Sequence, residues 1–143
     1  MLGIKKTGYR ENIWNGVGGK VEKGETSEQG IVREAREETT TRPMNFWEVA
    51  QLNALHRYKN GSVQHFVHVY LCDEWEGEFE PTKEFSPRWR KREDIPYDRM
   101  WEDTKLWLPQ VLGGNKVYGE FTYNTDDTLE THQIEIVEEL PRL

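Results

Sequence analysis

The chain has 143 residues and a formal net charge of −7, and these two numbers exclude several classes of function. A chain of this length can bury one sizeable core, so we expect residues 1–143 to form a single domain. The negative charge disfavours sequence-independent binding to long nucleic acid. The sequence contains neither a stretch of about eighteen apolar residues nor a signal peptide, so we expect a cytoplasmic protein that does not enter a membrane.

The N-terminal part of the chain predicts a short strand, a glycine turn and a helix. Residues 1–6 are typical of a short apolar strand, and residues 14–19 contain three glycines. Glycine permits a positive φ or a close approach of the backbone to a ligand. Thr26 and Gln29 have the spacing of a capping box, so we predict a helix over residues 27–39.

A long hairpin is expected next. Residues 46–56 have the composition of a strand, and Asn60-Gly61 is a strong signal for a two-residue turn. Residues 62–72 alternate most regularly between the two faces of a strand. The single cysteine, Cys72, excludes an internal disulfide, and its place in this apolar run predicts a buried, inert thiol.

The second half of the chain predicts an acidic loop, a helix and a closing hairpin. We expect another strand or a domain-closing segment over residues 89–95. A helix is expected from residue 103 or 104 to Gly113, and strands are expected over residues 118–123 and 129–137. The order of strands and helices lacks regular βαβ units. It therefore predicts an α+β fold around a mixed β-sheet.

Three carboxylates lie on one face of the first predicted helix. Glu34, Glu37 and Glu38 stand at i, i+3 and i+4, which places them side by side. Like charges at this spacing repel one another and destabilise the helix unless they share a cation. The spacing therefore suggests a metal site.

One pattern joins the glycine turn to this helix face: Gly19, five residues, Glu25, seven residues, then Arg33-Glu34-Ala35-Arg36-Glu37-Glu38. It resembles the signature of the MutT-like Nudix hydrolases, G-x5-E-x7-R-E-U-x-E-E-x-G-U, in which U is aliphatic. The chain departs from it at Thr40, where the family has glycine, and at Thr41, where it has an aliphatic residue. Because a β-branched residue is strained in a left-handed turn, we expect this helix to end differently.

The resemblance implies an α/β/α sandwich around the mixed sheet and metal-dependent cleavage of a nucleoside diphosphate linkage. It implies that Mg²⁺, or Mn²⁺, is held by the carbonyl of Gly18 and by Glu34, Glu37 and Glu38. Arg33 would pair with Glu25 and hold the loop against the helix. Glu84 is a candidate for a further ligand or base, or one more acid of an acidic loop. Lys5 and Lys20 are candidates for phosphate contacts.

Four more segments resemble the subgroup that hydrolyses oxidised purine nucleoside triphosphates such as 8-oxo-dGTP: WNGVGGKV, DIPYDRMWED, WLPQVL and YGEFTYNTDDTL. By this resemblance Asn15 would bind a purine edge and Trp101 would stack on the base. A turn-stabilising Asn15 and a core Trp101 are the alternatives. Asp103 would read the base, or cap the second helix. Tyr9 would line the base pocket.

Two departures from that subgroup are visible. The pair Asp103-Thr104 replaces two adjacent aspartates, and a hydroxyl cannot switch by protonation, so we do not expect both oxidised guanine and oxidised adenine to be accepted. In the family a full apolar strand precedes the segment that matches residues 1–9. We expect this first strand to be missing here, with the start set downstream or with a neighbouring strand or subunit filling the gap.

The function expected from the sequence is Mg²⁺-dependent hydrolysis of a nucleoside triphosphate, an oxidised purine such as 8-oxo-dGTP, to monophosphate and pyrophosphate. The partner is a nucleotide, and the protein is a monomer or homodimer. One alternative is a Nudix hydrolase that acts on a dinucleoside polyphosphate or a nucleotide sugar. The other is a catalytically weak nucleotide-binding module.

Overall fold

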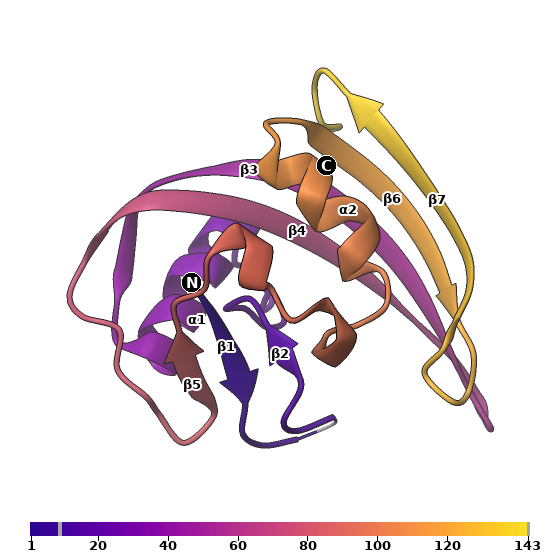
Figure 1. The fold of residues 1–143 in the computed structure, drawn as a ribbon, viewed down its shortest axis with the longest axis horizontal. Helices are drawn as coiled ribbons and strands as arrows, with labels where there is room; N and C mark the ends of the chain where they lie inside the picture. Colours follow the sequence, from indigo (N-terminus) through magenta and orange to yellow (C-terminus); the bar gives the residue numbers. More distant parts are fainter. Residues whose placement is uncertain (9, 143) are drawn as a thin grey trace. The chain divides into compact units, whose positions relative to one another are not determined.

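The computed structural model describes residues 1–8 and 10–142, which form two compact units. Unit 1 comprises residues 1–46 and 72–101, and unit 2 comprises residues 47–71 and the chain from residue 102 onward. The boundaries between the units cut through the two longest strands, β3 and β4, which are drawn in Figure 1. The expectation of a single domain over residues 1–143 stays a prediction.

Unit 1 contains a three-stranded antiparallel sheet in the order β2-β1-β5 (Figure 1). Its strands are β1 (Leu2–Lys5), β2 (Trp14–Asn15) and β5 (Phe85–Arg88). The central strand β1 confirms the short strand expected at the start of the chain, and both of its edges are paired. The missing first strand of the family stays a prediction.

Helix α1 (Ser27–Thr39) begins and ends where the sequence predicted. The Thr26 hydroxyl accepts a hydrogen bond from the Gln29 backbone at 3.1 Å, and the Gln29 side chain accepts one from the Thr26 backbone at 2.9 Å. This reciprocal pair satisfies two of the donors that a helix N-terminus leaves free. The capping box explains why the start of this helix can be read from local sequence.

The end of α1 contradicts the expectation made for Thr40. Thr40 adopts the left-handed conformation, with φ 62° and ψ 19°, so the helix leaves through the turn that glycine normally makes. The following loop holds it there: the Thr40 hydroxyl donates to the Glu78 carbonyl at 3.0 Å, and the Glu80 amide donates to the Thr39 carbonyl at 3.0 Å. These bonds offset the steric cost of a β-branched residue in this region.

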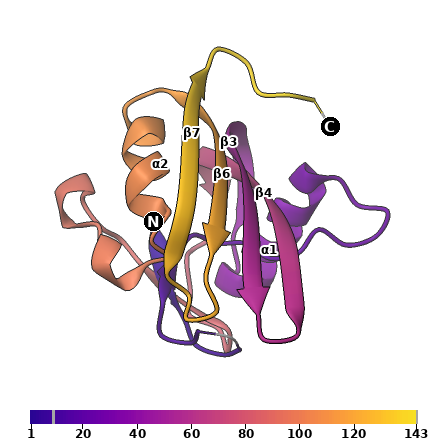
Figure 2. The same cartoon turned by 90° about the vertical axis from the view of Figure 1, so that its right-hand side faces the viewer.

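The second sheet has four strands in the order β4-β3-β6-β7 (Figure 2). They are β3 (Arg42–Tyr58), β4 (Gly61–Glu76), β6 (Lys116–Tyr123) and β7 (Leu129–Val137). Strand β3 runs parallel to β6, and β6 runs antiparallel to β7, which confirms the mixed sheet. The β3–β4 hairpin and the β6–β7 hairpin were both predicted, although β3 and β4 are longer than expected.

Helix α2 (Thr104–Leu112) packs on β6 within unit 2. Its buried residues include Leu108 and Val111, which face the core of this unit. That core is completed by apolar residues of β3 and β6: Val49, Ala50, Leu52, Val117, Phe121 and Tyr123. Among the described residues, no helix has the length and apolar character needed to cross a membrane.

Two expectations for the middle of the chain were wrong. No strand forms over residues 89–95: β5 ends at Arg88, which pairs with Leu2 at the start of β1, and a short 3-10 helix covers Arg92–Asp94 instead. A strand beyond Arg88 would have no partner in β1. Cys72 is exposed rather than buried, because it lies on β4, the edge strand of its sheet.

Candidate functional site

A backbone hydrogen bond ties the glycine turn to the carboxylate face of α1. The Gly18 amide donates to the Glu38 carboxylate at 2.8 Å, and Glu38 is nearly buried, with 9% of its surface exposed. The pKa of Glu38 is raised to about 7, first by burial and then by the charges of Glu34, Glu84 and Glu37, while the hydrogen bond from the Gly18 amide opposes the shift. The four carboxylates therefore lie close enough to act on one another, including Glu84 from the later loop.

Gly19 leaves the space that the Glu34 carboxylate occupies. A Cβ atom built on Gly19 would overlap all three terminal atoms of the Glu34 side chain, whereas a Cβ on Gly18 would meet nothing within 4 Å. Glycine at position 19 is thus needed for Glu34 to keep this position, and the reason is a steric contact rather than a positive φ. The absence of a side chain at Gly19 lets the Glu34 carboxylate lie directly against the backbone of the turn.

Arg33 links the loop before α1 to the helix face. Its Nε and Nη2 atoms donate to the two oxygens of Glu25 at 3.0 and 2.9 Å, and Nη2 also donates to the Lys20 carbonyl at 2.9 Å. Its Nη1 atom donates to Glu34 at 2.9 Å and to Glu37 at 3.2 Å. Hydrogen bonds from Arg33 lower the pKa of Glu25, and those to Glu25 and Glu34 raise the pKa of Arg33. The pairing of Arg33 with Glu25 is the one that the family resemblance implied.

The donor set of this region fits a hard divalent cation. It consists of carboxylates on one helix face and of a glycine turn whose backbone contacts them. The negative charge of Glu84 acts on the same cluster. In this arrangement, no three His, Cys, Asp or Glu side chains of the described residues converge as metal ligands. Arg33 holds Glu34 and Glu37, and Gly18 holds Glu38 through its amide rather than its carbonyl.

Three candidate substrate residues lie in unit 1 on or beside the β1–β2 hairpin. Asn15 ends β2 with its side chain exposed, and its Oδ1 accepts from the Gly16 amide at 2.9 Å, so the turn-stabilising role is present. Lys5 is the last residue of β1. Lys20 is exposed and contributes its carbonyl to Arg33. Tyr9 lies outside the described residues.

Trp101 has a cation against its ring. The Arg10 guanidinium carbon lies 4.3 Å from the centroid of the Trp101 ring, and Trp101 is half-buried. The ring is therefore not enclosed in the core, as the alternative for this residue required. Arg10 was missed in the sequence, because a single arginine in a loop with φ 54° carries no signal of its neighbour.

Asp103 makes a compact network inside unit 2. Its carboxylate accepts hydrogen bonds from the Trp107 indole at 2.7 Å and from the Tyr123 hydroxyl, while its own amide donates to the Tyr123 oxygen at 2.9 Å. Tyr123 is almost fully buried, and burial raises its pKa, with a further contribution from the Asp103 charge. Asp103 stands at the N-cap position of α2, but its side chain makes no capping bond.

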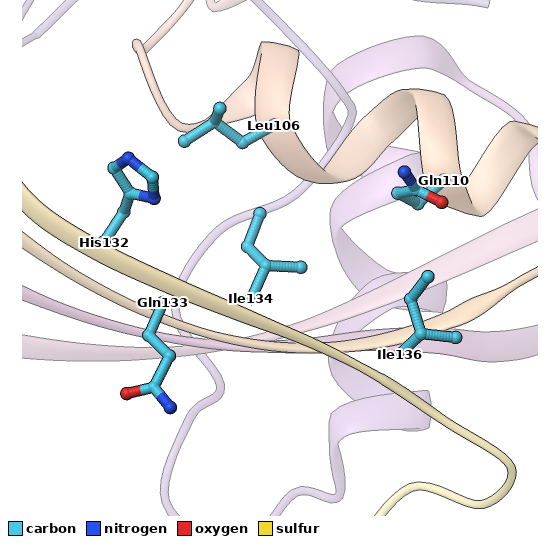
Figure 3. Close-up of a pocket in the computed structure, with 6 residues that line it drawn as sticks. All are labelled: Leu106, Gln110, His132, Gln133, Ile134 and Ile136. Carbon is cyan, nitrogen blue, oxygen red and sulfur yellow. The ribbon is translucent and has the colours of Figure 1, made fainter.

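A cavity of about 490 Å³ lies between α2 and β7 in unit 2 (Figure 3). Leu106 and Gln110 of α2 face Ile134 and Ile136 of β7 across it. None of the candidate site residues lines it. The carboxylate cluster of unit 1 is therefore the better-supported chemical site.

Comparison with protein families identifies one match that covers most of the chain. The family model described as NUDIX domain matches residues 2–111. The chain is 33% identical over 147 residues to an oxidized purine nucleoside triphosphate hydrolase of Danio rerio, covering 98% of this chain and 88% of that protein. It is 30% identical over 138 residues to the Mus musculus protein of the same name, covering 96% of this chain and 87% of that protein.

A solved structure has the same fold. The crystal structure of a mutator MutT protein from Bacillus halodurans superimposes with a TM-score of 0.78 at 24% sequence identity, covering 94% of this chain and 88% of that chain. At this level of identity the likeness establishes the fold alone. It agrees with the α+β architecture and the mixed sheet described above.

Proposed function

This chain belongs to the NUDIX domain family and is a Nudix hydrolase, and we propose that it hydrolyses an oxidised purine nucleoside triphosphate to the monophosphate and pyrophosphate. The reaction uses Mg²⁺, and Mn²⁺ can replace it. The observation that carries the proposal is the carboxylate face of α1 facing the glycine turn, with Gly18 bonded to Glu38 and Gly19 leaving room for Glu34.

The metal site consists of oxygen donors, as a hard cation requires. Glu34, Glu37, Glu38 and the Gly18 carbonyl would hold the cation, and Glu84 would serve as a further ligand or base. A divalent cation there would neutralise the charge of the polyphosphate and activate a water molecule. Arg33 and Glu25 keep the loop of residues 18–25 against α1 through a two-point ion pair, the geometry in which Arg–carboxylate pairs are strongest. Lys5 and Lys20 offset phosphate charge.

The choice of an oxidised purine is supported by two relatives and by Trp101. Both relatives are named oxidized purine nucleoside triphosphate hydrolases and align with nearly the whole chain. Trp101 is half-buried and in contact with a cation rather than enclosed in the core. Stacking of a base on an aromatic ring contributes roughly 1–3 kcal/mol to its binding. Among the described residues, the hydrogen bond of Asn15 within the turn uses Oδ1, and its amide NH₂ group is the donor that would contact a purine edge.

The proposal is tested by incubating the full chain and Mg²⁺ with a panel of normal and oxidised nucleoside triphosphates, a dinucleoside polyphosphate and a nucleotide sugar. Release of pyrophosphate from 8-oxo-dGTP, at a kcat/KM well above that for dGTP, supports the proposal. Preferential cleavage of the dinucleoside polyphosphate or the nucleotide sugar would replace the substrate class. Absence of turnover with every compound would reject the reaction itself.

The stacking role of Trp101 has its own test. Trp101→Ala should raise KM for the oxidised purine by one to two decades with little change in kcat, because a stacking energy of 1–3 kcal/mol is lost from the bound base. Trp89→Ala is the matched control, since Trp89 is the most exposed tryptophan, at 61%, and contacts other aromatic rings. An unchanged KM in Trp101→Ala would remove Trp101 from the base site.

A further inference from the structure

Arg33 uses every N–H donor of its guanidinium group, and the two ends of the group have different partners. The end formed by Nε and Nη2 holds Glu25 and the Lys20 carbonyl. The other end, Nη1, has two protons and donates one to Glu34 and one to Glu37. One end thus fastens the loop before the helix, and the other holds two carboxylates of the helix face.

The two ends are unequal. The contact with Glu25 is a two-point pair at 2.9 and 3.0 Å, and only 16% of the Glu25 side chain is exposed. The Nη1 end makes one bond to each of two carboxylates: at 2.9 Å to Glu34, which is 14% exposed, and at 3.2 Å to Glu37, which is 52% exposed. Two-point Arg–carboxylate pairs are strong, whereas single contacts to exposed carboxylates are weakened by solvent. The Glu37 contact is therefore the weakest of the set, and Nη1, which makes only single bonds, is the end that Arg33 can release more easily than the two-point pair with Glu25.

The Nη1 atom also lies where a positive charge most reduces the repulsion among the carboxylates of the helix face. Glu34, Glu37 and Glu38 repel one another across a single helix turn, and Nη1 lies within hydrogen-bond reach of two of them. A divalent cation ligated by the same two carboxylates would lie within a few ångströms of the guanidinium. Two like charges at that distance repel each other even when solvent reduces the field. The cation and Nη1 therefore compete for Glu34 and Glu37.

We propose that Arg33 is the resident counter-ion of this carboxylate cluster. In the metal-free protein its Nη1 end holds Glu34 and Glu37, and it yields them when a divalent cation binds, while the Glu25 end keeps the loop in place. Arg33 is thus a positioning residue that lowers the affinity for metal and offsets the repulsion among the carboxylates of the helix face. The inference rests on the proposed metal site.

The first test measures Mn²⁺ binding to the metal-free full chain by electron paramagnetic resonance of free Mn²⁺. Arg33→Gln should bind Mn²⁺ at least about fivefold more tightly than wild type, because a competing charge is removed. Arg36→Gln is the matched control: it removes the same charge from an exposed position of α1 that takes part in none of the ion pairs among the described residues. It should change the affinity by less than about twofold.

Unchanged or weaker Mn²⁺ binding by Arg33→Gln overturns the inference, because a residue that only preorganises the ligands would weaken binding when removed. An equal gain in Arg36→Gln also overturns it, since the effect would then be one of net charge. If wild type binds no Mn²⁺ at all, the proposed metal site fails first, and the inference fails with it.

The second test needs no variant, so it is independent of any loosening of the loop in Arg33→Gln. The arginine side-chain NMR signals of the wild-type protein are followed during titration with Mg²⁺. The Arg33 Nε–H signal should stay in place, because Glu25 is retained, while the Nη1 protons should exchange faster with water. Signals that are unaffected at both ends, or released at both ends, contradict the proposal.

Discussion

Gly19 and Glu34 share one small volume: the carboxylate of Glu34 lies where the side chain of any other residue at position 19 would begin. The atom that such a side chain would meet belongs to the flexible end of Glu34, not to the backbone. The protein can therefore accommodate a substitution by moving the carboxylate, and the fold need not change. The cost falls on the position of a candidate metal ligand rather than on stability.

Gly19→Ala should consequently separate activity from folding. We expect kcat/KM to fall by roughly 10- to 100-fold, because a displacement of about 1 Å at a catalytic group has effects of this size. The melting temperature should change by no more than a few degrees. Gly18→Ala is the control, since a Cβ there meets nothing within 4 Å and the backbone carbonyl is retained. Equal losses of activity in both variants would contradict the role of the Gly19–Glu34 contact.

Glu38 should make the stability of the metal-free protein depend on pH. Its pKa is about 7 in the folded protein and 4.5 ordinarily, so between these values the folded chain retains a proton that the unfolded chain has lost. Stability therefore decreases as the pH rises from about 4.5 to about 7. The contribution is at most about 3 kcal/mol, since one pKa unit corresponds to about 1.4 kcal/mol.

The measurement for Glu38 is urea unfolding in the presence of EDTA at several pH values between 5 and 8. Glu38→Gln keeps an oxygen that can accept the Gly18 hydrogen bond but cannot titrate, so it should lack the decrease seen in wild type. The comparison cancels the contributions of other acids, such as Glu25, whose pKa is lowered and whose effect has the opposite sign. Parallel pH profiles for the two proteins would contradict the prediction.

Thr40 stands in a strained conformation, and its side-chain hydroxyl helps to hold it there. Thr40→Val keeps the β-branched shape but loses the bond to the Glu78 carbonyl, so the free energy of unfolding should fall by about 1 kcal/mol. Thr40→Asn should be neutral or stabilising by up to about 1 kcal/mol, because asparagine tolerates the left-handed region. Urea unfolding of both variants gives the order, and a Thr40→Val protein as stable as wild type would contradict it.

The error for Thr40 shows where local sequence stops deciding the structure. The start of α1 was predicted correctly because its cap involves residues three apart, Thr26 and Gln29. Its end depends on Glu78 and Glu80, almost forty residues later, and no local preference reports their position. The strand expected over residues 89–95 failed for a similar reason. Its composition suits a strand, but β5 ends at Arg88, which pairs with Leu2 at the first position of β1.

In the candidate site, too, the features set by local spacing could be predicted from the sequence, and the contacts between distant residues could not. The spacing of Glu34, Glu37 and Glu38 is local, so the sequence was enough to predict that these charges crowd one another and need a cation. The only cation predicted there was a metal ion, and Arg33 was not considered for this role. Arg33 precedes Glu37 by four residues, a spacing that places the two side chains together on a helix, so the internal cation could have been found. The contacts of Arg10 with Trp101 and of Tyr123 with Asp103 have no such periodicity.

Tyr123 should stabilise the position of Asp103, the residue that the sequence analysis proposed as a contact to the base. Tyr123→Phe preserves the buried ring but removes the hydroxyl that both donates to the Asp103 carboxylate and accepts from its amide. The half-buried Asp103 groups would lose two bonds, so the free energy of unfolding should fall by about 1–3 kcal/mol. Tyr118→Phe, on the same strand, is the control. Urea unfolding at pH 7.5 measures both.

Asp103→Asn separates the structural role of this carboxylate from the reading of a base. The amide can still accept one bond at its oxygen but offers NH₂ protons to the other donor, so a purely structural role predicts a stability loss of about 1–3 kcal/mol with an unchanged preference among nucleotides. We expect this result, because Trp107 and Tyr123 already use both oxygens of Asp103. A changed ratio of kcat/KM for oxidised guanine and oxidised adenine triphosphates, with the fold intact, would instead assign Asp103 to the base.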